Sequence, residues 1–164
     1  MKKLLTAICI LYSGVNFAQV NLEHQYTKAN VYITQIGATD WNYYTFIPSI
    51  STLTIYDINH SLLKTISIPA VSGFSPEYIY SVSTNLFNTD SYYEYGVVYI
   101  GPYDRYFIYN ELGTQLLNVD SANYSTCYNT SAGLKLIINS AGAKVPFGNV
   151  YSLGGNFLAA TPEI

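Results

Sequence analysis

The feature that most constrains the fold is a hairpin pattern that recurs along the chain. A run of β-branched and aromatic residues ends at Asp or Asn, a turn follows, and a second apolar run begins. The pattern occurs at residues 53–57 and 62–68, at 106–110 and 114–119, and at 134–139 and 143–145. The side chains of Asp57, Asn110 and Asn139 suit this place because they accept hydrogen bonds from turn amides. Gly113 and Gly142 tolerate the positive φ that such turns need, so we expect three antiparallel hairpins.

Further strand-like runs precede each hairpin and extend it into a sheet. They lie at residues 31–36, 43–47, 78–83, 93–100 and 124–128. We expect three units of three or four antiparallel strands, at residues 26–70, 76–120 and 123–154, the last being the shortest. Four strands in about forty to fifty residues are typical of propeller blades. The sequence therefore predicts a single all-β domain over residues 19–155 with blade-like sheets, and a β-sandwich is the alternative.

The first eighteen residues have the pattern of a secretory signal. Lys2 and Lys3 precede an apolar run at residues 4–12 that is too short to span a bilayer, and Ala18 before Gln19 marks the expected cleavage point. No later segment is apolar enough for a transmembrane helix. We expect a secreted or cell-surface protein, with residues 156–164 as a C-terminal tail.

The composition excludes nucleic acid as a partner. Without residues 1–18 the chain keeps five basic and ten acidic residues, a net charge of −5, and Arg105 is its only arginine. Such a surface repels a phosphate backbone. Cys127 is then the only cysteine, so no internal disulfide can form and the fold must be stabilised by packing and by sheet hydrogen bonds.

The residues that carry chemistry do not form a recognisable catalytic or metal-binding motif. His24 and His60 are far apart and lack metal-ligand spacing, and no serine lies in a Gly-x-Ser-x-Gly elbow. Cys127 lies in an expected strand, as a buried thiol would. The sequence predicts a protein that is not an enzyme and that has no cofactor. A carbohydrate-active enzyme with two facing carboxylates and a small outer-membrane β-barrel are the alternatives.

The excess of tyrosine is the feature with the most functional meaning. Aromatic residues are 16% of the chain, with 18 tyrosines. Exposed aromatic rings stack on sugars and anchor protein interfaces, whereas buried ones fill a sheet core. The candidates for ligand stacking are Trp41, Tyr43, Tyr44, Tyr92, Tyr93, Tyr95 and Tyr103. We therefore expect a binding, adhesion or structural module whose partner is a glycan or a cell-surface protein.

Four segments resemble exported proteins of Bacteroidetes such as flavobacteria: Phe-Ala-Gln at 17–19, the hairpin at 53–69, and the segments 82–90 and 149–155. In those proteins a β-rich, propeller-like module precedes a type IX secretion sorting domain. The resemblance covers most of residues 22–155 and implies the fold and the extracellular location, with no catalytic residue. Because the chain ends at Ile164, the sorting domain is not expected here.

The same resemblance predicts a modification. Asp120, Ser121 and Ala122 match the short Asp-Ser/Thr-small pattern at which such proteins resemble acceptors for O-glycosylation, although Asp-Ser is also ordinary turn chemistry. Because the tripeptide follows the strand that ends at Val119, we expect Ser121 to be exposed and to carry a glycan. The intact mass of protein exported by its native host tests this prediction. The mass of an unmodified chain would contradict it.

Overall fold

The computed structural model describes residues 22–36, 40–140 and 146–155. The predicted signal at residues 1–18 and the predicted tail at residues 156–164 lie outside these ranges. The described residues form eleven strands and one three-residue 3-10 helix, Pro48–Ile50, which begins at a proline. The predicted all-β fold is therefore confirmed.

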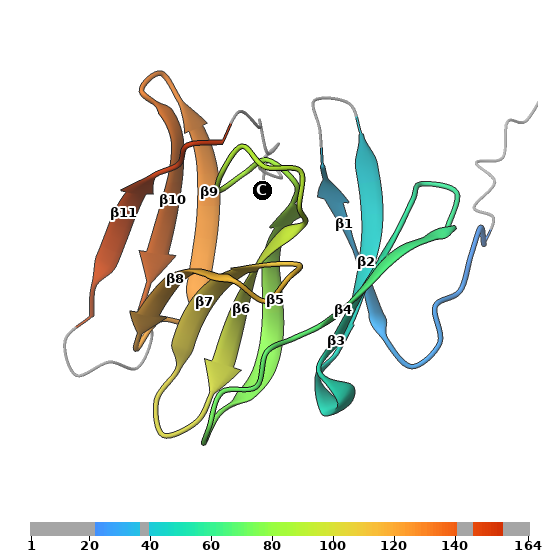
Figure 1. Cartoon of the computed structure of the whole chain (residues 1–164), viewed down its shortest axis with the longest axis horizontal. Helices are drawn as coiled ribbons and strands as arrows, with labels where there is room; N and C mark the ends of the chain where they lie inside the picture. Colours follow the sequence, from blue (N-terminus) through green and yellow to red (C-terminus); the bar gives the residue numbers. More distant parts are fainter. Residues whose placement is uncertain (1–21, 37–39, 141–145, 156–164) are drawn as a thin grey trace, which may run out of the picture.

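The strands form three antiparallel sheets in which neighbours follow one another along the chain. Sheet 1 contains β1 (Asn30–Gln35), β2 (Trp41–Ile47), β3 (Thr52–Tyr56) and β4 (Leu62–Ser67). Sheet 2 contains β5 (Ser75–Ser83), β6 (Glu94–Ile100), β7 (Arg105–Asn110) and β8 (Gln115–Asp120). Sheet 3 contains β9 (Tyr124–Thr130), β10 (Gly133–Asn139) and β11 (Gly148–Ser152). Each sheet is thus a simple meander (Figure 1).

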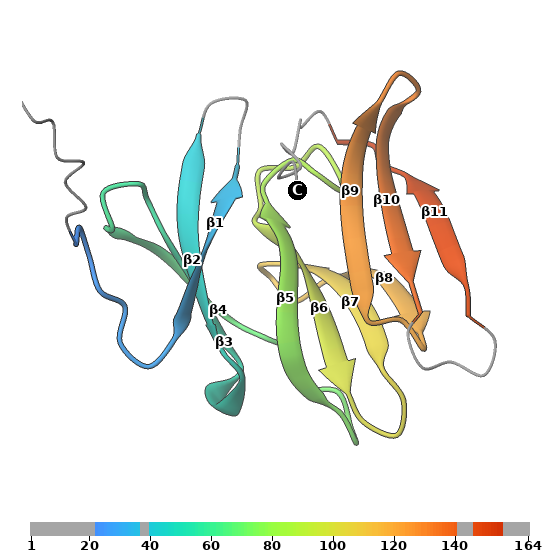
Figure 2. The same ribbon diagram turned by 180° about the vertical axis from the view of Figure 1, so that it is seen from behind.

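Sheet 2 lies between the other two sheets, as both views show (Figures 1 and 2). Because successive side chains of a strand point to opposite faces, Tyr95, Val97 and Tyr99 of β6 pack toward sheet 1, whereas Val98 packs toward sheet 3. The first six of the seven residues of β6 are buried. This double burial explains why residues 95–100 of β6 form a continuous apolar run instead of an alternating one.

Two hydrophobic cores result from this layering. The core between sheets 1 and 2 contains Tyr44, Phe46, Leu53, Ile55, Ile66, Ile68, Ile79, Val82, Tyr95, Val97, Tyr99, Phe107 and Tyr109. The core on the other face of sheet 2 contains Leu86, Val98, Tyr106, Ile108, Val119, Ala122, Cys127, Leu134, Leu136 and Ile138. The first strands of the sheets also contact one another, β1 with β5 and β5 with β9. The sheets therefore stack face to face, as both blade-like sheets and a sandwich require.

The first two predicted hairpins are confirmed as β3–β4 and β7–β8. Their two turns have the same hydrogen-bond pattern. The Oδ1 atom of Asp57 accepts hydrogen bonds from the amides two and four residues later, at 2.9 and 2.8 Å. The Oδ1 atom of Asn110 accepts the equivalent pair at 3.1 and 2.9 Å. His60 and Gly113 occupy the same place with φ of 65° and 79°. The two hairpins thus resemble each other even in the atoms that close the turn.

The prediction for the third hairpin is wrong in its second strand. The sequence predicted the second strand of this hairpin at residues 143–145, whereas β10 pairs with β11 at Gly148–Ser152. Residues 141–145, with Gly142, lie outside the described ranges. Because β10 is the second strand of its sheet, Asn139 precedes a loop between second and third strands and is not equivalent to Asp57. A short apolar run followed by Ser-Ala-Gly fits either kind of loop, so the local pattern could not distinguish them.

A glycine in β6 allows sheets 2 and 3 to be tied together by a tyrosine. The ring of Tyr106 lies over Gly96, and its buried hydroxyl accepts a hydrogen bond of 2.8 Å from Oγ of Ser125 on β9. A Cβ atom at position 96 would overlap the Tyr106 hydroxyl. The close approach of the ring therefore requires glycine at this position.

We predict that Gly96→Ala lowers the free energy of unfolding by about 1–3 kcal/mol, because the added methyl group overpacks the core. Urea denaturation measures the change. Gly154→Ala is the control, since a Cβ atom there would meet only an ordinary contact at 4.0 Å. Equal stability of the Gly96→Ala variant and the unsubstituted protein would contradict the placement of Tyr106 over β6.

Candidate functional site

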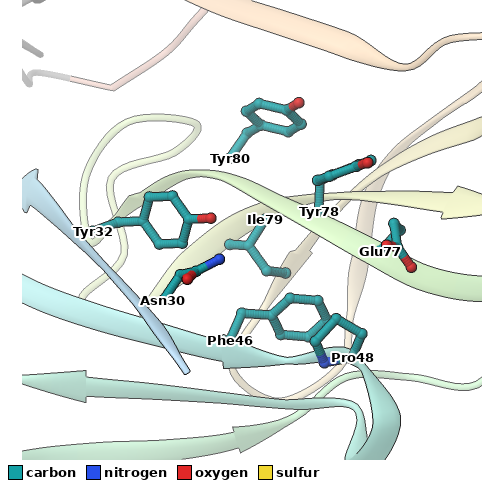
Figure 3. Close-up of a pocket in the computed structure, with 8 residues that line it drawn as sticks. All are labelled: Asn30, Tyr32, Phe46, Pro48, Glu77, Tyr78, Ile79 and Tyr80. Carbon is teal, nitrogen blue, oxygen red and sulfur yellow. The ribbon is translucent and has the colours of Figure 1, made fainter. Parts of the chain in front are cut away.

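A groove opens between β1 and β2 of sheet 1 and β5 of sheet 2, and we call it the tyrosine groove (Figure 3). It is lined by Asn30, Tyr32, Phe46, Pro48, Glu77, Tyr78, Ile79 and Tyr80. Its position follows from the fold, because the first strands of sheets 1 and 2 lie next to each other. The groove therefore joins residues that are more than forty positions apart in the sequence.

The groove has an apolar floor and aromatic sides. Phe46 and Ile79 are buried members of the core between sheets 1 and 2, and they approach one another from facing strands (Figure 3). The side chains of Tyr32 and Tyr78 are 47% and 49% exposed. An aromatic ring that is half exposed above a rigid floor can accept a flat apolar surface without reorganisation.

A bulge in β5 sets the direction of the acidic residue. Pairing with β6 shifts between Pro76 and Tyr78, so Glu77 has no partner in the ladder. Tyr78 and Tyr80, two positions apart, lie on one side of β5, and Ile79 points to the other, toward Phe46 (Figure 3). Bulges re-aim side chains, and here the bulge places a carboxylate at the end of the groove.

The hydroxyl groups of Tyr80 in the groove and of the neighbouring Tyr44 stay protonated at neutral pH. Tyr32 stacks on Tyr44 with ring centroids 5.2 Å apart, and burial raises the pKa of the Tyr44 hydroxyl. Burial also raises the pKa of Tyr80. These phenols can therefore both donate and accept hydrogen bonds. Glu77 is the only acidic or basic side chain among the lining residues.

This arrangement is suited to a ligand with flat apolar faces and many hydroxyl groups. The exposed rings offer stacking surfaces, while the amide of Asn30 and the carboxylate of Glu77 offer hydrogen-bond partners at the edge. Among the described residues that line the groove, none is a lysine or an arginine, so none of them selects an anion.

Two of the residues predicted to stack on a ligand are buried, which corrects the prediction. Tyr44 is 7% exposed and Tyr95 is fully buried, both in the core between sheets 1 and 2. Tyr95 lies on the strand that is covered on both faces, so its ring has no access to a ligand. The sequence could not show this, because burial depends on which sheet covers the strand.

The other five candidates are not brought together. Trp41 and Tyr43 are two residues apart on β2 and point away from sheet 2, on the outer face of sheet 1. Tyr92 and Tyr93 precede β6, where the Tyr93 hydroxyl accepts a hydrogen bond of 3.3 Å from Asn42. Tyr103 is exposed in the turn after β6. These side chains do not form one platform.

Sequence reasoning missed the tyrosines of the groove. Tyr78 and Tyr80 alternate along one strand, which is a signal for a shared face, but nothing local indicates that this face is partly open. Tyr32 joins them only because β1 lies against β5. The missing information is the contact between sheets.

Buried polar groups outside the groove have structural roles. Glu94 is fully buried, and burial raises the pKa of its carboxyl group. Its Oε2 atom accepts a hydrogen bond of 3.0 Å from the Phe87 amide and so holds the loop before β6. Cys127 is a buried free thiol, as expected, and burial raises its pKa, which disfavours the reactive thiolate. Within the described residues, no three His, Cys, Asp or Glu side chains are grouped to hold a metal ion.

Ser121 follows β8 in a turn and is partly exposed, with a φ of 59°. Its amide donates a hydrogen bond of 2.7 Å to the Asp104 carbonyl. Ser121 thus lies outside the strand, and its glycosylation stays a prediction.

Comparison of the chain with protein-family profiles, with curated proteins and with solved structures found no match. Across the described ranges, no helix has the length and apolar character needed to cross a membrane.

Proposed function

We propose that the protein is an exported, non-enzymatic module, secreted or held at the cell surface, that binds a neutral glycan in the tyrosine groove. The observation that carries this proposal is the half-exposed ring of Tyr32 beside the apolar floor, with the half-exposed ring of Tyr78 on the other side of β5 and a carboxylate and an amide at the edge of the groove. Sugar rings present apolar C–H faces and polar edges, and they need both kinds of contact.

The charges favour a neutral glycan over an acidic one. The chain has a net charge of −3, and Glu77 is the only charged residue among the described residues that line the groove. Two cationic side chains elsewhere are already paired: Lys64 with Glu111 at 2.8 Å, and Arg105 with Asp120 at 2.6 Å. A carboxylated or sulfated sugar would therefore meet repulsion without a compensating cation.

The distribution of carboxylates supports binding without hydrolysis. Glycosidases of the common kinds use two carboxyl groups that flank one bond. Glu77 lies near the start of β5, whereas Glu94 pairs with Ser83 at the end of the same strand. The two groups thus lie at opposite ends of a nine-residue strand and do not face one groove.

The support for export comes from the sequence. Lys2 and Lys3 precede a short apolar run, and several segments resemble exported Bacteroidetes proteins. The chain has a low content of charged residues, 10%, and many tyrosine, serine, threonine and asparagine residues, some of which must supply its polar surface. Such a surface is suited to hydrogen bonding with glycans outside the cell.

We predict that Tyr32→Ala and Tyr78→Ala each weaken the binding of a neutral oligosaccharide about two- to tenfold, because each removes a stacking ring worth roughly 0.5–1.5 kcal/mol. A glycan array identifies the oligosaccharide, and titration calorimetry measures its affinity. Tyr103→Ala, which removes an exposed ring outside the groove, is the matched control. Failure to bind any neutral glycan, or equal loss in the control, would contradict the proposal.

A further inference from the structure

The segment at residues 22–27, which we call the N-terminal strap, lies on the outer face of sheet 1 (Figure 1). Tyr26 of the strap packs against Tyr43 of β2 and Tyr56 of β3, with ring centroids 6.3 and 4.9 Å away. Tyr43 and Tyr56 are directly paired across the two strands. The strap thus covers the aromatic part of the face of sheet 1 that points away from sheet 2.

Both histidines of the chain hold the strap in place. His60 occupies the turn after β3 and is sandwiched between His24 of the strap and Tyr43 of the sheet. The His24 and His60 rings are 4.5 Å apart at 14°, and the His60 and Tyr43 rings are 4.9 Å apart at 11°. The strap and the sheet therefore meet through one continuous stack of three rings.

The nitrogen atoms of His60 also face the strap. Its Nδ1 atom is 2.9 Å from the Tyr26 hydroxyl, and its Nε2 atom is 3.5 Å from the Glu23 carboxylate. The His60 side chain is only 14% exposed, whereas that of Glu23 is 73% exposed. Of the other titratable groups nearby, Tyr56 faces Tyr26, and the Asp57 carboxylate is bonded to amides of its own turn.

One positive charge and two positive charges on the stacked histidine rings have different consequences in this geometry. A proton on His60 is compensated by the carboxylate of Glu23. A second proton, on His24, would place a like charge in a face-to-face stack at 4.5 Å, and like charges at this distance disfavour one another. Histidine is the side chain that gains its charge between pH 8 and pH 5.

We propose that the N-terminal strap is a pH-sensitive cover that lies on sheet 1 at neutral pH and lifts off when His24 and His60 are both protonated. Its release uncovers Tyr43 and Tyr56. These rings then join Val31, Ile33 and Trp41, which are already exposed on the same face, in one apolar surface. The device is independent of the tyrosine groove, which opens on the opposite face of sheet 1.

Hydrogen exchange of the purified protein, followed by mass spectrometry and corrected for the intrinsic effect of pH, tests this proposal. We expect the strap amides to exchange at least tenfold faster at pH 5 than at pH 7.5, while β6 keeps its protection. The emission of Trp41, the only tryptophan, should change over the same pH range because it lies on the uncovered face.

Two variants separate the histidine pair from other effects of acid. His24→Phe keeps an aromatic ring in the stack without the second charge, so it should abolish the pH response. Glu23→Gln removes the compensation for the first proton, so release should shift to higher pH. Unchanged protection of the strap at pH 5, or an unaltered pH response in His24→Phe, would overturn the proposal.

Discussion

The packing of β6 against two other sheets holds the molecule together. Tyr95, Val97 and Tyr99 contribute to one core, and Val98, on the opposite face of the same strand, contributes to the other. Full burial of a large apolar side chain stabilises a protein by roughly 1.5–3 kcal/mol. The buried side chains of this one strand therefore stabilise both cores considerably. Cys127 is a free thiol, and packing and hydrogen bonds therefore provide the stability.

The groove depends on this packing. Sheet 1 is fixed against sheet 2 through the core that contains Phe46 and Ile79, and these two residues also form the floor of the groove. The edge of the interface, where β1 meets β5, is left partly open, and Tyr32 and Tyr78 flank this opening. A binding surface at the margin of a core is rigid because its supporting residues cannot move without disturbing that core.

The sequence predicts those parts of the fold that depend on neighbours in the chain. Asp57 and Asn110 close their turns through amides two and four residues away, so the local pattern was sufficient to identify both hairpins. It could not show that Tyr95 is buried and Tyr78 is half exposed, since both lie in apolar strands and differ only in what covers them. The local sequence pattern also could not show which residues far apart in the chain contact one another. His24 and His60 stack although 36 positions separate them.

Hydrogen exchange resolved by strand tests whether sheet 2 is covered on both faces. If it is, the amides of β6 and β7 should exchange only through global unfolding and should be the slowest in the protein. β4 and β8, whose residues are mostly exposed, should exchange at least tenfold faster. Exchange of β6 as fast as that of β4 would show that sheet 2 is not the buried middle layer.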